Sequence, residues 1–182
     1  MKNRQIIETK RLKLRPFEMS DASMVQKYAG DYSVADTTLN VPHPYEDGMA
    51  EEWILTHQKG YDEGELINYA ITLKPENDII GAIGLTINKI FNQAELGYWI
   101  GKTYWNKGIC TEAAIALIDY AFKYHESHKI IATHILRNQA SGKVMQKIGM
   151  KLEGTFKEHV KKWDKMEDVN AYGILRSNWI EE

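Results

Sequence analysis

Cysteine is almost absent from this chain of 182 residues, since Cys110 is the only one. A lone cysteine can form no disulfide within the chain, which excludes the small disulfide-stapled domains and favours a reducing, cytoplasmic setting. The chain also has no apolar run near the roughly 20 residues that span a membrane. Its start, MKNRQIIETK, lacks the apolar core of a signal peptide. We therefore expect a cytoplasmic protein without a membrane partner.

The chain also has no large excess of positive or negative charge. The 23 Lys and Arg residues nearly balance 25 Asp and Glu residues, and the formal net charge is −2. Without a global basic field, direct binding of nucleic acid is not expected. The chain has only four prolines, and no repeat, low-complexity tract or linker divides it. Residues 1–182 are therefore expected to form a single domain, long enough for a substantial core.

Two familiar phosphate loops are missing. The chain contains no G-x-G-x-x-G, which argues against a Rossmann dinucleotide site. Gly101-Lys102-Thr103 imitates the end of a Walker A loop, but the first glycine of that motif would fall at Leu96. His125 and His128 have no third ligand at a diagnostic spacing, so we expect no metal.

The strongest pattern that is present runs from Ala94 to Phe122. It begins with an alternation that predicts a strand over Ala94 to Ile100. One side of this strand carries Leu96, Tyr98 and Ile100, and the other carries Glu95, Gly97 and Trp99. From Gly108 onward, apolar residues recur along one face and predict a long helix. These positions are Ile109, Ala113, Ala114, Leu117, Ile118, Ala121 and Phe122.

The junction between this strand and this helix, Asn106 to Thr111, is suited to bind phosphate. The first N–H groups of a helix have no partner inside it, and the helix dipole makes that end slightly positive. Gly108 lets an anionic group approach the backbone closely. We therefore expect a side chain at Gly108 to collide with phosphate and to cost ligand affinity more than stability.

The remaining elements predict a mixed α/β fold in the order βααβββαβαββ. Ser20 is the expected cap of the first helix and Asn138 that of the last, and the residues around 30–45 are expected to be irregular. A β-branched run after the long helix suits a strand parallel to the central one, joined to it by a helical crossover. The expected strands are 12–15, 67–73, 79–90, 94–100, 129–136, 150–157 and 169–175, and the other helices are 21–28, 46–61 and 138–147.

Several segments, in this order, resemble the GNAT acetyltransferases. The segments AELGYWI, YWNKG, TEAA and DYAF closely resemble the branch that acetylates ribosomal-protein N-termini. The opening ETKRLKLRPFEMSDA and the later NQASGKVMQKIGMKLEG are also similar to that branch. In the family pattern Q/R-x-x-G-x-G/A, Gly108 matches the central glycine, Cys110 takes the place of the final Gly or Ala, and Trp105 stands where Gln or Arg is usual. The resemblance implies the GNAT fold, with a central parallel strand pair that splays apart at one end.

The resemblance also implies acetyl-CoA as the co-substrate. Its pantetheine arm would bond to the main chain near the end of the central strand, and its pyrophosphate would rest on N–H groups of the junction. Asn138 would lie beside the pantetheine, although its role as a helix cap is an equally good interpretation. The residues expected at the co-substrate are Trp99, Ile100, Gly101, Lys107, Gly108, Ile109, Cys110, Thr111 and Asn138.

The implied chemistry is direct attack of a neutral amine on a thioester in a ternary complex, which needs a base. Glu95 matches a position where several GNAT enzymes place a glutamate base, and a solvated carboxylate is the alternative. Ser141 is the candidate acid, because Met145 stands where many GNAT enzymes have a tyrosine. A plain polar residue in the first turn of a helix is the alternative for Ser141. Cys110 as a nucleophile is disfavoured, since these enzymes transfer directly.

The acceptor is expected to be the N-terminal amine of a protein, as in the branch that the chain resembles. A small amine, such as a polyamine, an amino acid or an antibiotic, is the second choice. A GNAT fold that binds acyl-CoA without catalysis, as a regulatory module, also stays open. Homodimers are common in the branch. The late lysines Lys157, Lys161, Lys162 and Lys165 are interpreted as a solvated face that has a minor chance of binding an acidic partner.

Overall fold

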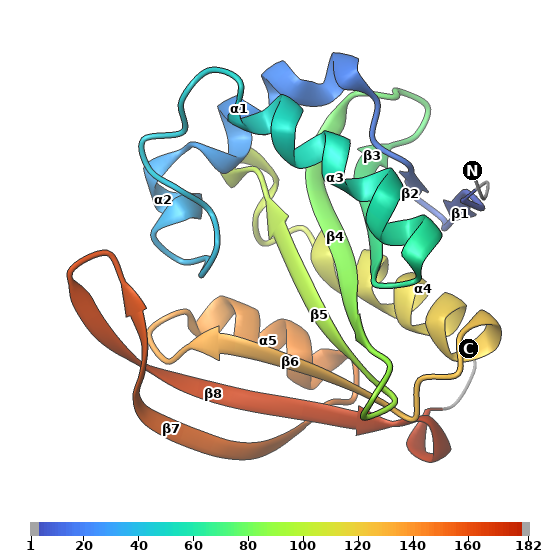
Figure 1. Ribbon diagram of the computed structural model, residues 1–182, viewed down its shortest axis with the longest axis vertical. Coiled ribbons are helices and arrows are strands. Elements are labelled where there is room, and N and C mark those ends of the chain that lie inside the picture. The colour runs from blue at the N-terminus through green and yellow to red at the C-terminus, as the bar shows by residue number, and fades with distance from the viewer. Residues whose placement is uncertain (1–3, 180–182) are drawn as a thin grey trace.

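One mixed sheet of eight strands organises the computed structural model, which describes residues 4–179. The strands lie in the order β1-β2-β3-β4-β5-β6-β8-β7, and Figure 1 shows their arrangement. The elements in chain order are β1 (Ile7–Glu8), β2 (Leu12–Arg15), η1 (Met19–Asp21), α1 (Ala22–Ala29), α2 (Tyr32–Ala35), α3 (Met49–Glu63), β3 (Leu66–Leu73), β4 (Ile79–Asn88), β5 (Gln93–Ile100), η2 (Lys102–Tyr104), α4 (Ile109–Tyr124), β6 (Lys129–Ile135), α5 (Gln139–Lys147), β7 (Lys151–Lys162), β8 (Lys165–Leu175) and η3 (Arg176–Asn178). The predicted order βααβββαβαββ is confirmed for all of its elements, and the structure adds two short ones, β1 and α2.

Helices cover both faces of the sheet, with α1 and α3 on one side and α4 and α5 on the other (Figure 1). Because successive side chains of a strand point to opposite faces, each strand feeds two cores. The larger core includes Leu117 and Ile118 of α4, which are fully buried. The smaller core joins Val25 of α1, Ile54 of α3 and Trp99 of β5.

The central strand and the strand after the long helix run parallel, as predicted. Their pairing is short: it joins Gln93 with Lys129, Ala94 with Ile130 and Glu95 with Ile131. Beyond that point β5 pairs only with β4, and β6 pairs only with β8. The two strands therefore diverge, and Figure 1 shows β5 and β6 pointing away from each other. The splayed pair expected from the family resemblance is confirmed.

The last hairpin is longer than predicted. Strands β7 and β8 extend through the expected polar loop, and their pairing continues to Lys162 and Lys165. Trp163, with a φ of 55°, takes the left-handed conformation at the turn. No apolar alternation marks this extension in the sequence, because most side chains of β7 are exposed. The prediction of a solvated lysine cluster is wrong for Lys162, which is 4% exposed.

Two short elements were not predicted, β1 and α2. The cap assigned to Ser20 is also wrong, because Ser20 lies inside η1 and Glu18 precedes that turn as its cap. Asp21 instead accepts two hydrogen bonds of 2.7 Å from the guanidinium of Arg15, and both side chains are buried. This buried ion pair fixes the start of α1 against strand β2.

Candidate active site

The turn between β5 and α4 forms one side of the site. Asn106 and Gly108 both take left-handed conformations, with φ values of 60° and 73°, and Gly108 is the N-cap of α4. The first helical bond runs from the N–H of Glu112 to the carbonyl of Gly108, at 3.1 Å. The N–H groups of Ile109, Cys110 and Thr111 precede that bond, so they have no acceptor inside the helix. Lys107 and Gly108 are exposed, which leaves this end of α4 open to a ligand.

The end of β5 is held by side chains on both faces of the sheet. Trp99 and Ile100 are buried, and Gly101 packs so closely on Tyr28 that a Cβ there would meet that ring at 2.8 Å. Trp105 donates its indole N–H to the carbonyl of Ile100 at 2.7 Å. The side chain that departs from the family pattern therefore fixes the end of the central strand. The main-chain edge of β5 that faces the gap stays unpaired beyond Glu95.

Glu95 lies where the parallel pairing ends. It is exposed, and its Oε1 accepts a 3.2 Å hydrogen bond from the hydroxyl of Thr133 on β6. The carboxylate thus lies at the closed end of the gap, where it accepts a bond from the strand on the other side. Alternation along β5 puts Glu95 on the same face as Trp99, the face that α1 and α3 cover.

Ser141 makes a close contact that the sequence did not reveal. Its Oγ lies 2.8 Å from the hydroxyl of Tyr98, which also lies 3.2 Å from the Ser141 carbonyl. This contact bridges β5 and α5 across the gap, on the face of the sheet opposite to Glu95. Burial raises the pKa of Tyr98 well above its usual value, so its hydroxyl stays protonated. The position of Tyr98 in the apolar stripe of β5 indicated only a core residue.

Cys110 lies in the same region, in the first turn of α4. It is half-buried, and burial raises the pKa of its thiol. A neutral thiol is a poor nucleophile. This agrees with the interpretation of Cys110 as a small apolar residue.

Asn138 is the cap of α5, as predicted. Its Oδ1 accepts a 3.2 Å bond from the N–H of Ser141, and its Nδ2 donates to the carbonyl of Thr37 at 3.1 Å. Both ends of the amide are therefore engaged with the protein. The contacts show a structural role, in which Asn138 joins the start of α5 to the segment after α2.

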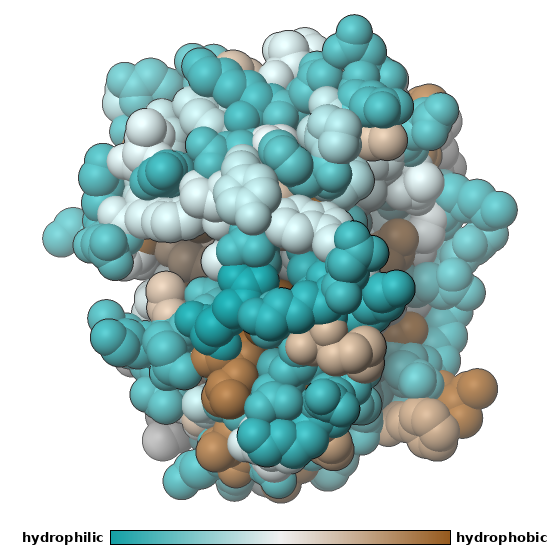
Figure 2. Space-filling view, turned by 90° about the vertical axis from the view of Figure 1, so that its left-hand side faces the viewer, coloured by the Kyte–Doolittle hydropathy of each residue, from teal (hydrophilic) through white to brown (hydrophobic). Residues whose placement is uncertain are grey.

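A cavity of about 340 Å³ lies between that segment and the tip of the β7–β8 hairpin. Charged side chains and two aromatic rings line it: Tyr32, Asp36, Arg137, Lys162, Trp163, Lys165 and Glu167. Figure 2 faces this side of the molecule and shows a band of hydrophilic side chains below paler ones. The residues around 30–45 form one wall of the cavity through Tyr32 and Asp36.

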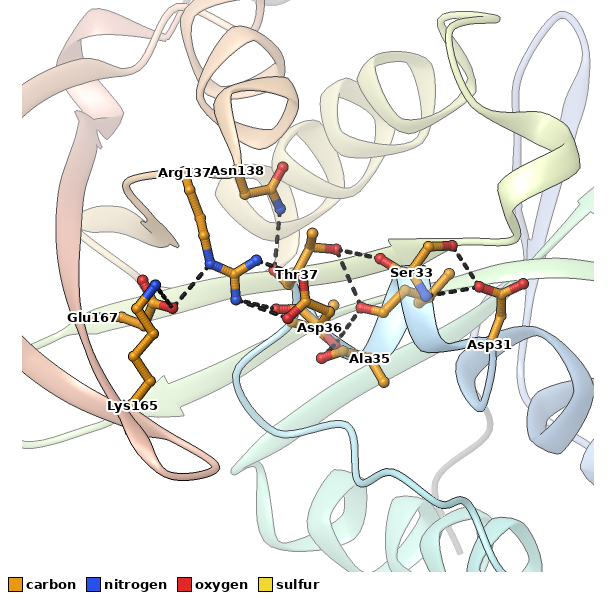
Figure 3. A network of polar contacts seen from close by, with 11 residues as sticks. Asp31, Ser33, Ala35, Asp36, Thr37, Arg137, Asn138, Lys165 and Glu167 are labelled. Carbon is orange, nitrogen blue, oxygen red and sulfur yellow. Dashed lines mark hydrogen bonds and ion pairs between the residues drawn. The ribbon is translucent and has the colours of Figure 1, made fainter.

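Arg137 is the centre of the polar network in this cavity (Figure 3). Its guanidinium bonds both carboxylate oxygens of Asp36, at 2.5 and 3.0 Å, and its Nε donates to Glu167 at 2.9 Å. Lys162 donates to the carbonyl of Val41 at 2.9 Å. Arg137, Asn138 and Lys162 thus all hold the segment that follows α2. Sequence reasoning missed Arg137 and Asp36, which are separated by 101 residues and share no local pattern.

Two kinds of feature are absent from the described part of the chain. Among residues 4–179, no three His, Cys, Asp or Glu side chains are grouped so that they could hold a metal ion. In the same range, no helix is long and apolar enough to cross a membrane.

Comparison with known proteins identifies the family. The model of the acetyltransferase (GNAT) domain matches residues 11–151. The chain is 36% identical over 175 residues to the uncharacterized N-acetyltransferase YnaD of Bacillus subtilis, covering 95% of this chain and 98% of that protein. A crystal structure of a GNAT-family acetyltransferase from Bacillus anthracis matches with a TM-score of 0.83 at 31% identity, over 95% of this chain and 99% of that one.

A relative with a named acceptor covers part of the chain. The ribosomal-protein-serine acetyltransferase of Escherichia coli is 29% identical over 123 residues, covering 67% of this chain and 65% of that protein. The resemblance to the ribosomal-protein branch is thereby confirmed. The chain belongs to the GNAT family of acetyltransferases, and it is an N-acetyltransferase that uses acetyl-CoA.

Proposed function

We propose that the whole chain, acting as one domain in the cytoplasm, transfers the acetyl group of acetyl-CoA directly to the N-terminal amine of a protein. The observation that carries the acceptor class is the similarity to the ribosomal-protein-serine acetyltransferase of Escherichia coli. The splayed strands and the cavity beside them support a ternary complex, because each can hold one substrate.

On the proposed assignment, acetyl-CoA occupies the gap between β5 and β6. The pantetheine amides lie along the gap-facing edge of β5, toward its end at Trp99, Ile100 and Gly101. The Gly101 N–H and the Ile100 carbonyl are already bonded to Ile80 and Trp105, so other main-chain groups of that edge bind the amides. The pyrophosphate rests on the N–H groups of Lys107 to Thr111, where the open N-terminus of α4 favours an anion. Main-chain binding of this kind explains why Trp105 and Cys110 can depart from the family pattern.

Glu95 is the proposed base. The amine nitrogen attacks the thioester carbon, and the proton that it loses passes to Glu95, directly or through a water molecule. The exposed position of Glu95 at the end of the paired region suits contact with a solvated amine, and the bond from Thr133 orients its carboxylate.

Ser141 and Tyr98 are the proposed acid pair. As the C–S bond breaks, the leaving thiolate takes a proton from the Ser141 hydroxyl, which Tyr98 holds in place at 2.8 Å. Because Tyr98 is protonated, it can support this transfer as a hydrogen-bond donor. The Ser141 oxygen regains a proton from solvent, and Glu95 releases to solvent the proton that it took from the amine. The pair lies on the opposite face of β5 from Glu95, so base and acid approach the gap from two sides.

The acceptor enters beside the segment that follows α2, on the proposed assignment. The cavity lined by Asp36, Arg137 and Glu167 lies next to the α5 end of the gap, since Asn138 joins it to the start of α5. Its opening between a loop and a hairpin tip leaves room for a chain that continues into solvent.

The test is a thiol-release assay with acetyl-CoA and matched acceptors. One peptide has a free N-terminus, a second has the same sequence with an acetylated N-terminus, and spermidine, free serine and an aminoglycoside antibiotic represent small amines. We expect release with the free peptide and none with the blocked one. Glu95→Gln should lower kcat about a hundredfold, as for loss of a general base. Glu153→Gln, another exposed strand carboxylate, is the control and should leave kcat unchanged.

Two other outcomes would decide against this proposal. Release with a small amine but not with the free peptide would assign the protein to the small-amine acetyltransferases. Calorimetric binding of acetyl-CoA without release from any acceptor would favour a regulatory module.

A further inference from the structure

The turn between β1 and β2 is bound to the start of α4 by four hydrogen bonds. The Thr9 hydroxyl and the Arg11 N–H both donate to Oε1 of Glu112, at 2.6 and 2.9 Å. The Arg11 Nε donates to Oε2 of the same carboxylate at 2.6 Å, and its Nη1 donates to the carbonyl of Lys107 at 2.9 Å. The opening segment that resembles the family therefore begins beside the junction between β5 and α4.

The presence of the Arg11 guanidinium beside the N-terminus of α4 needs a physical explanation. The N-terminus of a helix is the positive end of its dipole, so a cation beside it is unfavourable unless anions offset it. Glu112 supplies one negative charge, while Arg11 and the exposed Lys107 supply two positive ones. An anion bound at the N-terminus of α4 would offset this local excess of positive charge.

One part of the Arg11 side chain remains unused. A guanidinium offers five N–H donors in a planar fork, and Nε and Nη1 are engaged. Nη2 has no acceptor among residues 4–179, and it lies 3.5 Å from the place where a Cβ on Gly108 would stand. The unused donors therefore lie beside Gly108, and the side chain is 45% exposed.

We propose that Arg11 is a phosphate-binding residue, whose Nη2 donates to the diphosphate of acetyl-CoA beside Gly108. This inference rests on the proposed place of the diphosphate. Trp105 occupies the position where the family pattern has Gln or Arg, so a donor is missing from the loop itself. Arg11 supplies that donor from a strand at the other end of the sequence, and Thr9 and Glu112 hold it in position.

The experiment compares ligands with and without phosphate groups. Acetyl-CoA and 3′-dephospho-acetyl-CoA are titrated by calorimetry, and S-acetyl-pantetheine, which lacks the nucleotide, is measured by competition. For Arg11→Met we expect roughly tenfold weaker binding of both nucleotide ligands, as for loss of one charge-assisted hydrogen bond. Binding of S-acetyl-pantetheine should stay within about twofold of wild type, because that ligand makes no phosphate contact.

Two further variants make the result specific. Lys10→Met removes one positive charge from the same turn at an exposed residue, and it should change no affinity. Arg11→Lys keeps the charge but not the fork, and it should fall between wild type and Arg11→Met. It also serves as the test variant if Arg11→Met does not fold.

Three results would overturn the assignment. An equal loss for S-acetyl-pantetheine would show that Arg11 acts only by supporting the fold. Unchanged binding of acetyl-CoA would show no contact, and a loss that disappears with the dephospho ligand would move the contact to the 3′-phosphate. If wild type itself binds acetyl-CoA no better than S-acetyl-pantetheine, the proposed diphosphate site fails independently of Arg11.

Discussion

The two proposed substrate sites beside the gap are built from different chemical groups. The proposed co-substrate side consists mainly of main chain, namely the free edge of β5 and the open N–H groups at Gly108, with Arg11 as the side chain proposed to join them. The proposed acceptor side consists of side chains, since Arg137 binds Asp36 and Glu167 and Lys162 holds the carbonyl of Val41. A backbone site depends on conformation and tolerates changes of side chain, whereas an ion-pair network depends on every member.

This difference matches the chemistry of the two substrates. Acetyl-CoA is the same molecule in every enzyme of the family, and its amides and phosphates are groups that a backbone can bind. The acceptor differs between enzymes, so its site needs side chains that can change. The variants below test whether a change on one side alters only the binding of the substrate proposed for that side.

The largest effect is expected at Gly108. Gly108→Val places a branched side chain where the diphosphate is proposed to lie, so affinity for acetyl-CoA should fall at least about a hundredfold, as several charge-assisted bonds are lost. The φ of 73° adds a cost in stability that the sequence did not show, because a branched residue is strained there. Calorimetry measures the affinity, and thermal unfolding measures the strain.

Gly48 provides the matched control for that variant. It is also the N-cap of a helix, with a φ of 89°, and no atom lies within 4 Å of a Cβ built on it. Gly48→Val should lower Tm by a similar amount and leave the affinity for acetyl-CoA unchanged. Equal losses of affinity in the two variants would show that strain, not collision, weakens binding.

A smaller effect is expected on the acceptor side, on KM for the peptide and not on Kd for acetyl-CoA. Arg137→Met removes the ion-pair partner of Asp36 and leaves Glu167 with Lys165 alone, so the segment after α2 loses one of its three anchors. KM for the peptide should rise about tenfold, as for one misplaced charged contact, while Kd for acetyl-CoA stays unchanged. Lys157→Met breaks an exposed ion pair on the same hairpin and should change neither constant. A rise in Kd for acetyl-CoA would break the division between the two sides.

The smallest effect concerns Glu112 and pH. Partial burial alone would raise the pKa of Glu112, but the hydrogen bonds from Thr9 and Arg11 together hold it below its ordinary value. A carboxyl with a lowered pKa in the folded state adds stability above its unfolded pKa of about 4.5, and that stability is lost as the pH falls through the folded value. The Tm of wild type should exceed that of Glu112→Gln by a few degrees at pH 7, and the gap should narrow below about pH 4. A constant gap from pH 7 to pH 3 would contradict the assignment.

The backbone features around the proposed co-substrate site could be predicted from the sequence because their signals are local. A glycine before an apolar helical face marked the N-terminus of α4, and a β-branched run marked the parallel strand β6. Asn138 was identified as a cap because the residue type fits that position. In each case neighbouring residues along the chain carry the information.

The side-chain part could not be predicted, for two physical reasons. Arg137 and Asp36 meet only because the fold brings segments 101 residues apart into contact. The β7–β8 hairpin that closes the cavity is mostly exposed, so it has no apolar period to mark its length. Tyr98 was missed for another reason. A tyrosine in an apolar stripe is expected to be a core residue, and only the structure shows that its hydroxyl contacts Ser141.

The short parallel pairing of β5 and β6 has a thermodynamic consequence. Three residue pairs join the two halves of the sheet, and beyond them the seam is open. A ligand that fills this seam, as proposed for acetyl-CoA, binds the folded chain and not the unfolded one, so folding and binding are linked by mass action. At a ligand concentration a hundred times Kd, that linkage adds about 2.7 kcal/mol to the free energy of unfolding. We therefore expect the unfolded fraction of this protein to fall as the concentration of acetyl-CoA rises.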